Sequence, residues 1–242
     1  LVDITLDNNE LENISSFSYQ GNPNLVLLLA YQNKIKFIPE NILRHKAIFS
    51  LDLENNYIDD IPSMIQVMET LVHLNLEGNN ISNIPPELFS LKLLSTLALS
   101  RNNITTIPHE IVNGARKESM VDFEYLTFAG NKLVTLPERF FELKCANLDL
   151  RDNSLKTLPE WTTESTVGNH VYLSGNPLCN LALREALDKK YRKELDRLES
   201  QVPAEGCTPQ CALTCFDYYR GSYSCDRGCN IKKCNFDDGD CE

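Results

Sequence analysis

The chain has 242 residues, of which 42% are hydrophobic, a fraction that is ordinary for a soluble fold with a sizeable core. Its 34 acidic residues outnumber its 23 basic ones, and the net charge of −11 argues against a surface for nucleic acid or an anionic membrane. The longest apolar stretch, Leu25–Ala30, is far shorter than the roughly 18 residues of a membrane span. We therefore expect no nucleic-acid partner and no membrane span in this sequence.

One apolar pattern repeats through the first three quarters of the chain. The spacing Leu-x-x-Leu-x-Leu-x-x-Asn at 71–79 recurs 23 residues later at 94–102, and the same frame covers 1–179 in eight units. Leu1 already stands in this frame without an apparent N-terminal cap, so we expect the protein to continue upstream. The ninth position of each unit holds an Asn: Asn9, Asn33, Asn56, Asn79, Asn102, Asn131, Asn153 and Asn176.

This pattern resembles the leucine-rich repeat family. The resemblance implies an α/β solenoid, a horseshoe of about eight repeats in which each Leu-x-x-Leu-x-Leu turn is a short strand of one parallel sheet. We expect each ninth-position Asn amide to satisfy backbone groups that the bend after the strand would leave unpaired. The Ile-Pro or Leu-Pro that follows favours short helical turns on the convex side.

Two details depart from the regular unit. The step from Leu94 to Phe123 is 29 residues, which predicts a longer polar loop around 113–120, and we interpret it as a tolerated insertion. Cys145 occupies an apolar position, which favours a buried free thiol. The four His residues fall in different units or on different faces, so we find no catalytic dyad and expect no enzyme: His45, His73, His109 and His170.

Residues 180–207 carry the signs of a cap on the solenoid. Asn180 is a candidate helix N-cap, and the apolar residues that follow share one helical face, which would cover the last repeat. A partner-binding helix is the alternative. The junction at 176–179 resembles the cysteine-containing caps of extracellular leucine-rich repeat proteins, and this resemblance implies a Cys179–Cys207 disulfide.

Seven of the 9 cysteines lie between Cys207 and Cys241. So short a segment cannot bury enough apolar surface to fold alone, and it needs disulfides or a metal. Disulfides would indicate an oxidising compartment, and a cytosolic zinc knuckle is the alternative. The carboxylates at 237–240 suit calcium better than zinc, because calcium prefers hard oxygen ligands.

The spacing Cys211-x3-Cys215-x9-Cys225-x3-Cys229-x4-Cys234-x6-Cys241 resembles the Notch-type (LNR) repeat, which would occupy 208–242. The resemblance implies three disulfides, Cys211–Cys234, Cys215–Cys229 and Cys225–Cys241, in a small calcium-binding module.

The same resemblance implies that Asp237 and Asp240 are the side-chain ligands of one calcium ion. Ser222 stands where the family usually has Asn, so a hydroxyl or backbone oxygen would replace that ligand. The side chains of Asp217 or Asp226 and the carbonyls of Tyr219 and Ser224 could supply further oxygens, since calcium takes six to eight. An acidic turn without metal is the alternative.

In leucine-rich repeat proteins the outward-pointing strand residues line a concave docking face. The N-terminal half of this face is acidic and carries aromatic residues, which suits a basic protein or peptide partner, although a solvated face without a partner is the alternative. The candidate partner-binding residues are Asp3, Asp7, Tyr31, Asp52, Glu54, His73, Asn75, Glu77, Tyr125 and Tyr172.

Three Asn-x-Ser/Thr sequons, at Asn13, Asn80 and Asn103, lie just after strands, where glycans would leave the concave face free. Together with the Notch-type resemblance they favour a secreted or cell-surface protein. The leading hypothesis is a non-enzymatic recognition module, a receptor ectodomain or secreted binding protein. The alternative is a gating module in which the Notch-type repeat masks a neighbouring segment and the repeats serve as a spacer.

Overall fold

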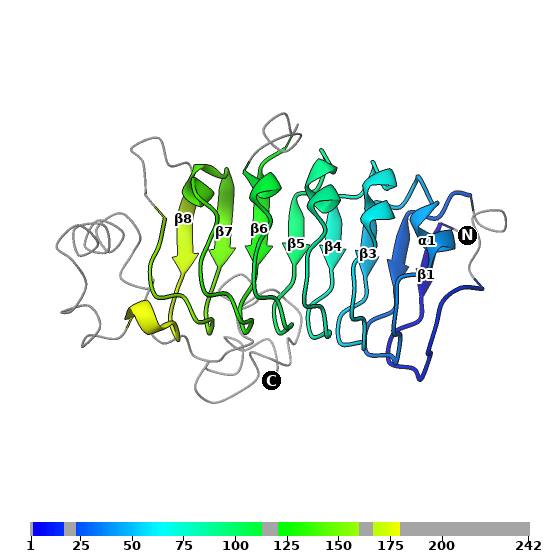
Figure 1. The fold of residues 1–242 in the computed structure, drawn as a ribbon. Coiled ribbons are helices and arrows are strands. Elements are labelled where there is room, and N and C mark those ends of the chain that lie inside the picture. Colours follow the sequence, from blue (N-terminus) through cyan, green and yellow to red (C-terminus); the bar gives the residue numbers. More distant parts are fainter. Residues whose placement is uncertain (1, 17–22, 113–120, 160–166, 180–242) are drawn as a thin grey trace, which may run out of the picture.

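The structure is a computed structural model that describes residues 2–16, 23–112, 121–159 and 167–179. Eight short strands form one parallel sheet whose spatial order follows the chain order (Figure 1). One strand belongs to each coil, so the predicted leucine-rich repeat solenoid is confirmed. The strands are β1 (Asp3–Thr5), β2 (Leu27–Leu29), β3 (Ser50–Asp52), β4 (His73–Asn75), β5 (Thr96–Ala98), β6 (Phe123–Thr127), β7 (Cys145–Asp149) and β8 (Val167–Tyr172).

The apolar positions of the repeat form a continuous core on one side of the sheet. Leu51 lies in register with Leu28 and Leu74, so like side chains stack from coil to coil. All three are fully buried, and burial of a leucine side chain stabilises a fold by about 1.5–3 kcal/mol. The residues that alternate with Leu51, Ser50 and Asp52, point to the opposite, open face of the sheet.

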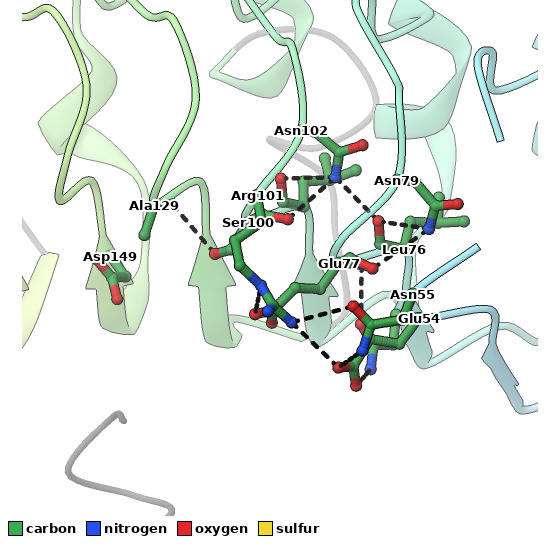
Figure 2. Close-up of polar contacts among 12 residues, drawn as sticks. Glu54, Asn55, Leu76, Glu77, Asn79, Ser100, Arg101, Asn102, Ala129 and Asp149 are labelled. Carbon is green, nitrogen blue, oxygen red and sulfur yellow. Dashed lines mark hydrogen bonds and ion pairs between the residues drawn. The ribbon is translucent and has the colours of Figure 1, made fainter. Parts of the chain in front are cut away.

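The ninth-position asparagines form a buried ladder, as predicted. Asn79 donates from Nδ2 to the carbonyls of Leu53 and Leu76, both at 3.0 Å, and its Oδ1 accepts from the Ile58 N–H at 2.9 Å. Leu53 and Ile58 belong to the preceding coil, so Asn79 joins two coils. Asn102 bonds in the same way (Figure 2). The exposed Asn9, in the first coil, bonds to the carbonyls of Leu6 and Asp7 in its own coil.

The eighth residue of every coil has a left-handed backbone, which the repeat pattern did not lead us to expect. Gly, Asn and Asp adopt this conformation at the lowest cost, and they fill all but two of these positions. Gln32 and Arg101 adopt it without that advantage. The φ angles lie between +52° and +77° at Asn8, Gln32, Asn55, Gly78, Arg101, Gly130, Asp152 and Gly175.

Short helical turns form the convex side, as the Ile-Pro and Leu-Pro pairs predict. The first four begin directly after a proline: α1 (Glu40–Leu43) and the 3₁₀ helices η1 (Ser63–Val67), η2 (Pro86–Ser90) and η3 (His109–Ile111). Two further 3₁₀ helices are η5 (Phe140–Glu142) and η6 (Pro177–Cys179). No helix within the described ranges is long and apolar enough to cross a membrane.

Cys145 is buried, as predicted, and its Sγ lies 3.2 Å from the carbonyl oxygen of Asn147. Cys179 is disulfide-bonded, but its partner lies outside the described residues, so the Cys179–Cys207 pair stays a prediction. The insertion loop at 113–120, the cap at 180–207 and the Notch-type repeat at 208–242 also lie outside them.

Candidate functional site

The open face of the sheet carries two adjoining groups of side chains on β1 to β4. The acidic strip follows the carboxyl ends of these strands and consists of Asp7, Tyr31, Asp52, Glu54 and Glu77. The apolar patch consists of Leu27 and Leu29 of β2, together with Val2 directly before β1 and Phe49 directly before β3. The parallel register brings these residues from four coils into neighbouring rows.

Tyr31 stands in the middle of the acidic strip. Its hydroxyl donates a hydrogen bond to Asp7, and this bond together with the charges of Asp7, Asp52 and Glu54 raises the pKa of Tyr31. The Asp7 carboxylate also accepts a hydrogen bond from Asn8 Nδ2 at 2.8 Å, which lowers the pKa of Asp7. Three carboxylates therefore surround one phenol.

Asp52 is held only by neutral donors. Its Oδ1 accepts from the Glu54 N–H at 2.9 Å and its Oδ2 from Asn75 Nδ2 at 3.2 Å. Burial, and then the negative charges of Glu54 and Asp7, raise the pKa of Asp52 to about 6. Among the described residues no cation counters this shift, so a positive charge placed here would be stabilised.

Arg101 spans two coils at the far end of the acidic strip (Figure 2). Its Nε donates to Glu77 Oε1 at 3.0 Å, and Nη2 reaches Asn55 Oδ1 at 3.3 Å and Glu54 Oε1 at 3.4 Å. Burial raises the pKa of Glu77 to about 7, and Arg101 opposes that shift. The repeat pattern did not reveal this bridge, because it depends on a side chain that reaches back across 24 and 47 residues.

The apolar patch is exposed beside these charges. Leu27 and Leu29 point outward on either side of the buried Leu28, and both are half-buried. Val2 is 54% exposed and Phe49 is 44% exposed. The Phe49 ring meets the His73 ring edge-on, with centroids 5.0 Å apart. Val2 and Phe49 precede the strands, so a search of strand positions alone did not find them.

In the C-terminal half of the open face, Asp149 and Arg151 form a buried ion pair. Arg151 donates from Nε to both carboxylate oxygens of Asp149 at 3.0 Å, and its guanidinium lies 5.6 Å from the centre of the Tyr172 ring. Asp149 and Arg151 are 2% and 1% exposed. Burial raises the pKa of Asp149, and Arg151 opposes the shift.

Two predicted docking residues are not exposed, which corrects the sequence-based expectation. Glu77 is 6% exposed because Arg101 lies against it, and Tyr172 is 5% exposed beside Arg151. Asp3 is exposed, and the remaining candidates are half-buried on the open face: Asp7, Tyr31, Asp52, Glu54, His73, Asn75 and Tyr125.

Each sequon asparagine lies in a segment that connects two consecutive strands. Asn13 and Asn80 are exposed and Asn103 is half-buried, and all three stand outside the strands. Within the described part of the chain, no three His, Cys, Asp or Glu residues are grouped so that they could hold a metal ion. The predicted calcium ligands at 217–240 lie outside that part.

Comparisons with known proteins identify both modules. The leucine rich repeat family model matches residues 69–115, and the LNR domain model matches residues 206–242. The comparison with curated proteins gives no significant match.

Similar solved structures share the repeat fold. A leucine-rich repeat protein of Leptospira interrogans is 28% identical, covers 84% of this chain and 48% of its own, and has a TM-score of 0.69. The internalin InlF of Listeria monocytogenes is 22% identical, with coverage of 70% and 47% and a TM-score of 0.53. The ectodomain of the receptor kinase GASSHO1/SCHENGEN3 of Arabidopsis thaliana, solved with CASPARIAN STRIP INTEGRITY FACTOR 2, is 24% identical, with coverage of 73% and 22% and a TM-score of 0.54.

The chain spans about half the length of the Leptospira and Listeria proteins. The eight in-register strands, the two family models and the similar structures agree. The chain therefore contains leucine-rich repeats, matched by the family model at residues 69–115, and an LNR domain at residues 206–242.

Proposed function

We propose that this chain is a non-enzymatic recognition module of an extracellular protein, and that it binds a basic protein or peptide on the open face of its sheet. Leucine-rich repeat and LNR modules are typically protein-binding and non-enzymatic, which supports the proposal. The observation that carries it is the like-charged, partly open acidic strip on β1 to β4, since a surface of one sign attracts a partner of the other.

The test is capture of a partner from native extracellular material by the immobilised chain in calcium. The triple variant Asp3→Lys/Asp7→Lys/Glu54→Lys reverses charges on the open face at exposed or half-buried sites. The matched control Asp59→Lys/Asp60→Lys/Glu69→Lys makes the same change in charge at exposed sites outside the strands.

We expect the wild type and the control variant to capture the same protein and the open-face variant to lose it. Circular dichroism checks that each variant is folded. Equal capture by both variants would contradict recognition on the open face, and no capture by any folded form would favour a structural or spacer role.

The LNR match supports a second part of the proposal, that calcium stabilises the C-terminal module. Asp237 and Asp240 would be its side-chain ligands, with oxygens of Ser222, Asp217, Asp226, Tyr219 and Ser224 as candidates for the rest. Chelator should lower the melting temperature of the wild type, and Asp240→Ala should lower it in calcium. An equal melting temperature with and without calcium would contradict this part.

The LNR match also favours the second candidate function, in which this module masks a neighbouring segment and the repeats are a spacer. That function predicts that Asp240→Ala or chelator, rather than charge reversal on the open face, changes what the chain binds. The capture experiment with both kinds of variant therefore separates the two candidates. The sequons and the LNR match support an extracellular location.

A further inference from the structure

Apolar and acidic side chains adjoin on the same open sheet. Leu29 of β2 lies in register with Asp52 of β3, so the apolar patch and the acidic strip meet at neighbouring strands. Val2 and Phe49 extend the patch to the coils on either side of β2. Exposed large apolar residues beside charged ones are characteristic of partner-binding surfaces.

Arg101 shows that the acidic strip accommodates a cationic side chain. This cation of the chain itself occupies the β4 end of the strip between Glu77 and Glu54 (Figure 2), and it does so from a left-handed backbone position. At the other end of the strip, the carboxylates of Asp7 and Asp52 receive only neutral donors among the described residues. That end has the charge to hold a further cation.

The dimensions of the surface favour a helix. The five residues from Leu27 to Tyr31 cover four steps, about 13 Å along β2 and just beyond it, and the two steps between the strands β1, β2 and β3 span about 10 Å. An α-helix is about 10–12 Å across with its side chains, and about seven residues cover 10 Å of its length. Its turns repeat every 5.4 Å or so, close to the strand spacing of about 4.8 Å, whereas same-face residues of an extended chain are nearly 7 Å apart.

We infer that the apolar patch and the β1–β3 part of the acidic strip form one docking surface for a cationic amphipathic helix of a partner protein. Its apolar side chains cover Leu27, Leu29 and Phe49, and its Lys or Arg side chains pair with Asp7, Asp52 and Glu54. The inference rests on the proposed recognition function. It adds which part of the open face binds the partner and which arrangement of apolar and cationic side chains the partner presents.

The test uses a designed probe, a fluorescein-labelled helical peptide of about 14 Leu and Lys residues with Leu at i, i+3, i+4 and i+7. A scrambled peptide of the same composition and a peptide with Glu in place of Lys are the controls. Fluorescence anisotropy with the whole chain in calcium should give binding at least about tenfold tighter for the patterned peptide than for the scrambled one. The Glu peptide should not bind.

Two pairs of variants locate the probe. Asp52→Asn/Glu54→Gln should weaken binding about tenfold, and the matched Asp59→Asn/Asp60→Asn should leave it unchanged. Phe49→Ser should weaken binding about fivefold, and Tyr57→Ser, at an exposed aromatic of the same coil outside the strands, should not. Circular dichroism verifies the fold of all four.

Equal affinity for the scrambled peptide, or equal losses in the matched variants, would overturn the inference, because binding would then reflect net charge alone. This failure is distinct from failure of the proposed function. A native partner that is lost from Asp3→Lys/Asp7→Lys/Glu54→Lys would leave recognition on the open face in place even if the helical probe does not bind.

Discussion

The two halves of the open face use the same coil geometry for opposite electrostatic arrangements. The fifth and seventh positions of a coil hold Asp52 and Glu54 around β3, and they hold Asp149 and Arg151 around β7. Around β7, Arg151 Nη2 lies 2.6 Å from Asp149 Oδ2, and both side chains are buried. Around β3, burial and then the negative charge of Glu54 raise the pKa of Asp52 to about 6. The residue at the seventh position therefore decides whether the charges of a coil pair with each other or stay available to a partner.

The largest expected effect comes from replacing the buried ion pair around β7 with two carboxylates, the arrangement found around β3. Arg151→Glu would place a second carboxylate beside the buried Asp149 and should lower the free energy of unfolding by at least about 3–5 kcal/mol. Urea denaturation followed by circular dichroism measures this loss, with Glu54→Gln as the matched change at the same position of the open half. A loss below about 1 kcal/mol would show that the buried pair does not distinguish the two halves.

The raised pKa values of Asp52 and Glu77 should make the stability of the chain depend on pH. In the unfolded chain Asp52 and Glu77 lose their protons near pH 4, whereas in the folded chain they keep them up to pH values of about 6 and 7. The folded chain binds more protons in that window, so stability from these groups is complete below about pH 4 and is lost as pH rises to 7. The free energy of unfolding should fall by a few kcal/mol between these values.

The double variant Asp52→Asn/Glu77→Gln should flatten this profile. Urea denaturation at a series of pH values measures the slope for both forms of the chain. An unchanged slope in the variant would assign the pH dependence to other groups.

A smaller effect is expected from placing around β3 the kind of ion pair that is found around β7. Glu54→Arg would create next to Asp52 the pair that Arg151 forms with Asp149, so the pKa of Asp52 should fall. Stability at pH 7 should rise by less than about 1 kcal/mol, because the change also removes the contact between Glu54 and Arg101. Carboxyl NMR titration and urea denaturation measure the two quantities, and an Asp52 pKa that remains near 6 would contradict the comparison.

The smallest expected change in stability is at Arg101, whose side chain lies at the β4 end of the acidic strip. Arg101→Gly removes a partner of Glu77 but relieves the left-handed backbone, and the latter contributes about 1 kcal/mol in the opposite direction. Stability should therefore change by less than about 1 kcal/mol, while the pKa of Glu77 rises above about 7. An NMR titration in which the Glu77 pKa falls would contradict the assigned role of Arg101.

The sequence predicted the features that depend on the period of the repeat. The buried strand residues such as Leu51, the Asn79 ladder and the turns after proline all follow from positions within one coil. It did not predict the burial of Glu77 and Tyr172 or the exposed position of Phe49 beside His73. Those depend on which side chain stands in the neighbouring coil, more than 20 residues away, and the period carries no information about that choice.

The left-handed eighth position was also missed. Its mixture of Asn, Gln, Gly, Arg and Asp hides a common backbone, although the three glycines and two asparagines at this position were a signal that could have been used. The calcium ligands and the disulfides of the LNR module remain predictions from resemblance.

The Asn ladder gives the solenoid a direction. Asn176 of the last described coil serves Leu150 and Leu155 of the coil before it, and Asn33 serves Leu6 and Leu11 in the same sense. Each coil is thus completed by the one that follows it in the chain. On the ribosome, a newly emerged coil satisfies part of its bend with its own Asn, and the backbone groups that the next Asn serves wait until the next coil has been synthesised. Deleting a coil from the C-terminal end leaves the preceding coil with unmet backbone groups, whereas deleting the first leaves the next with a solvated Asn.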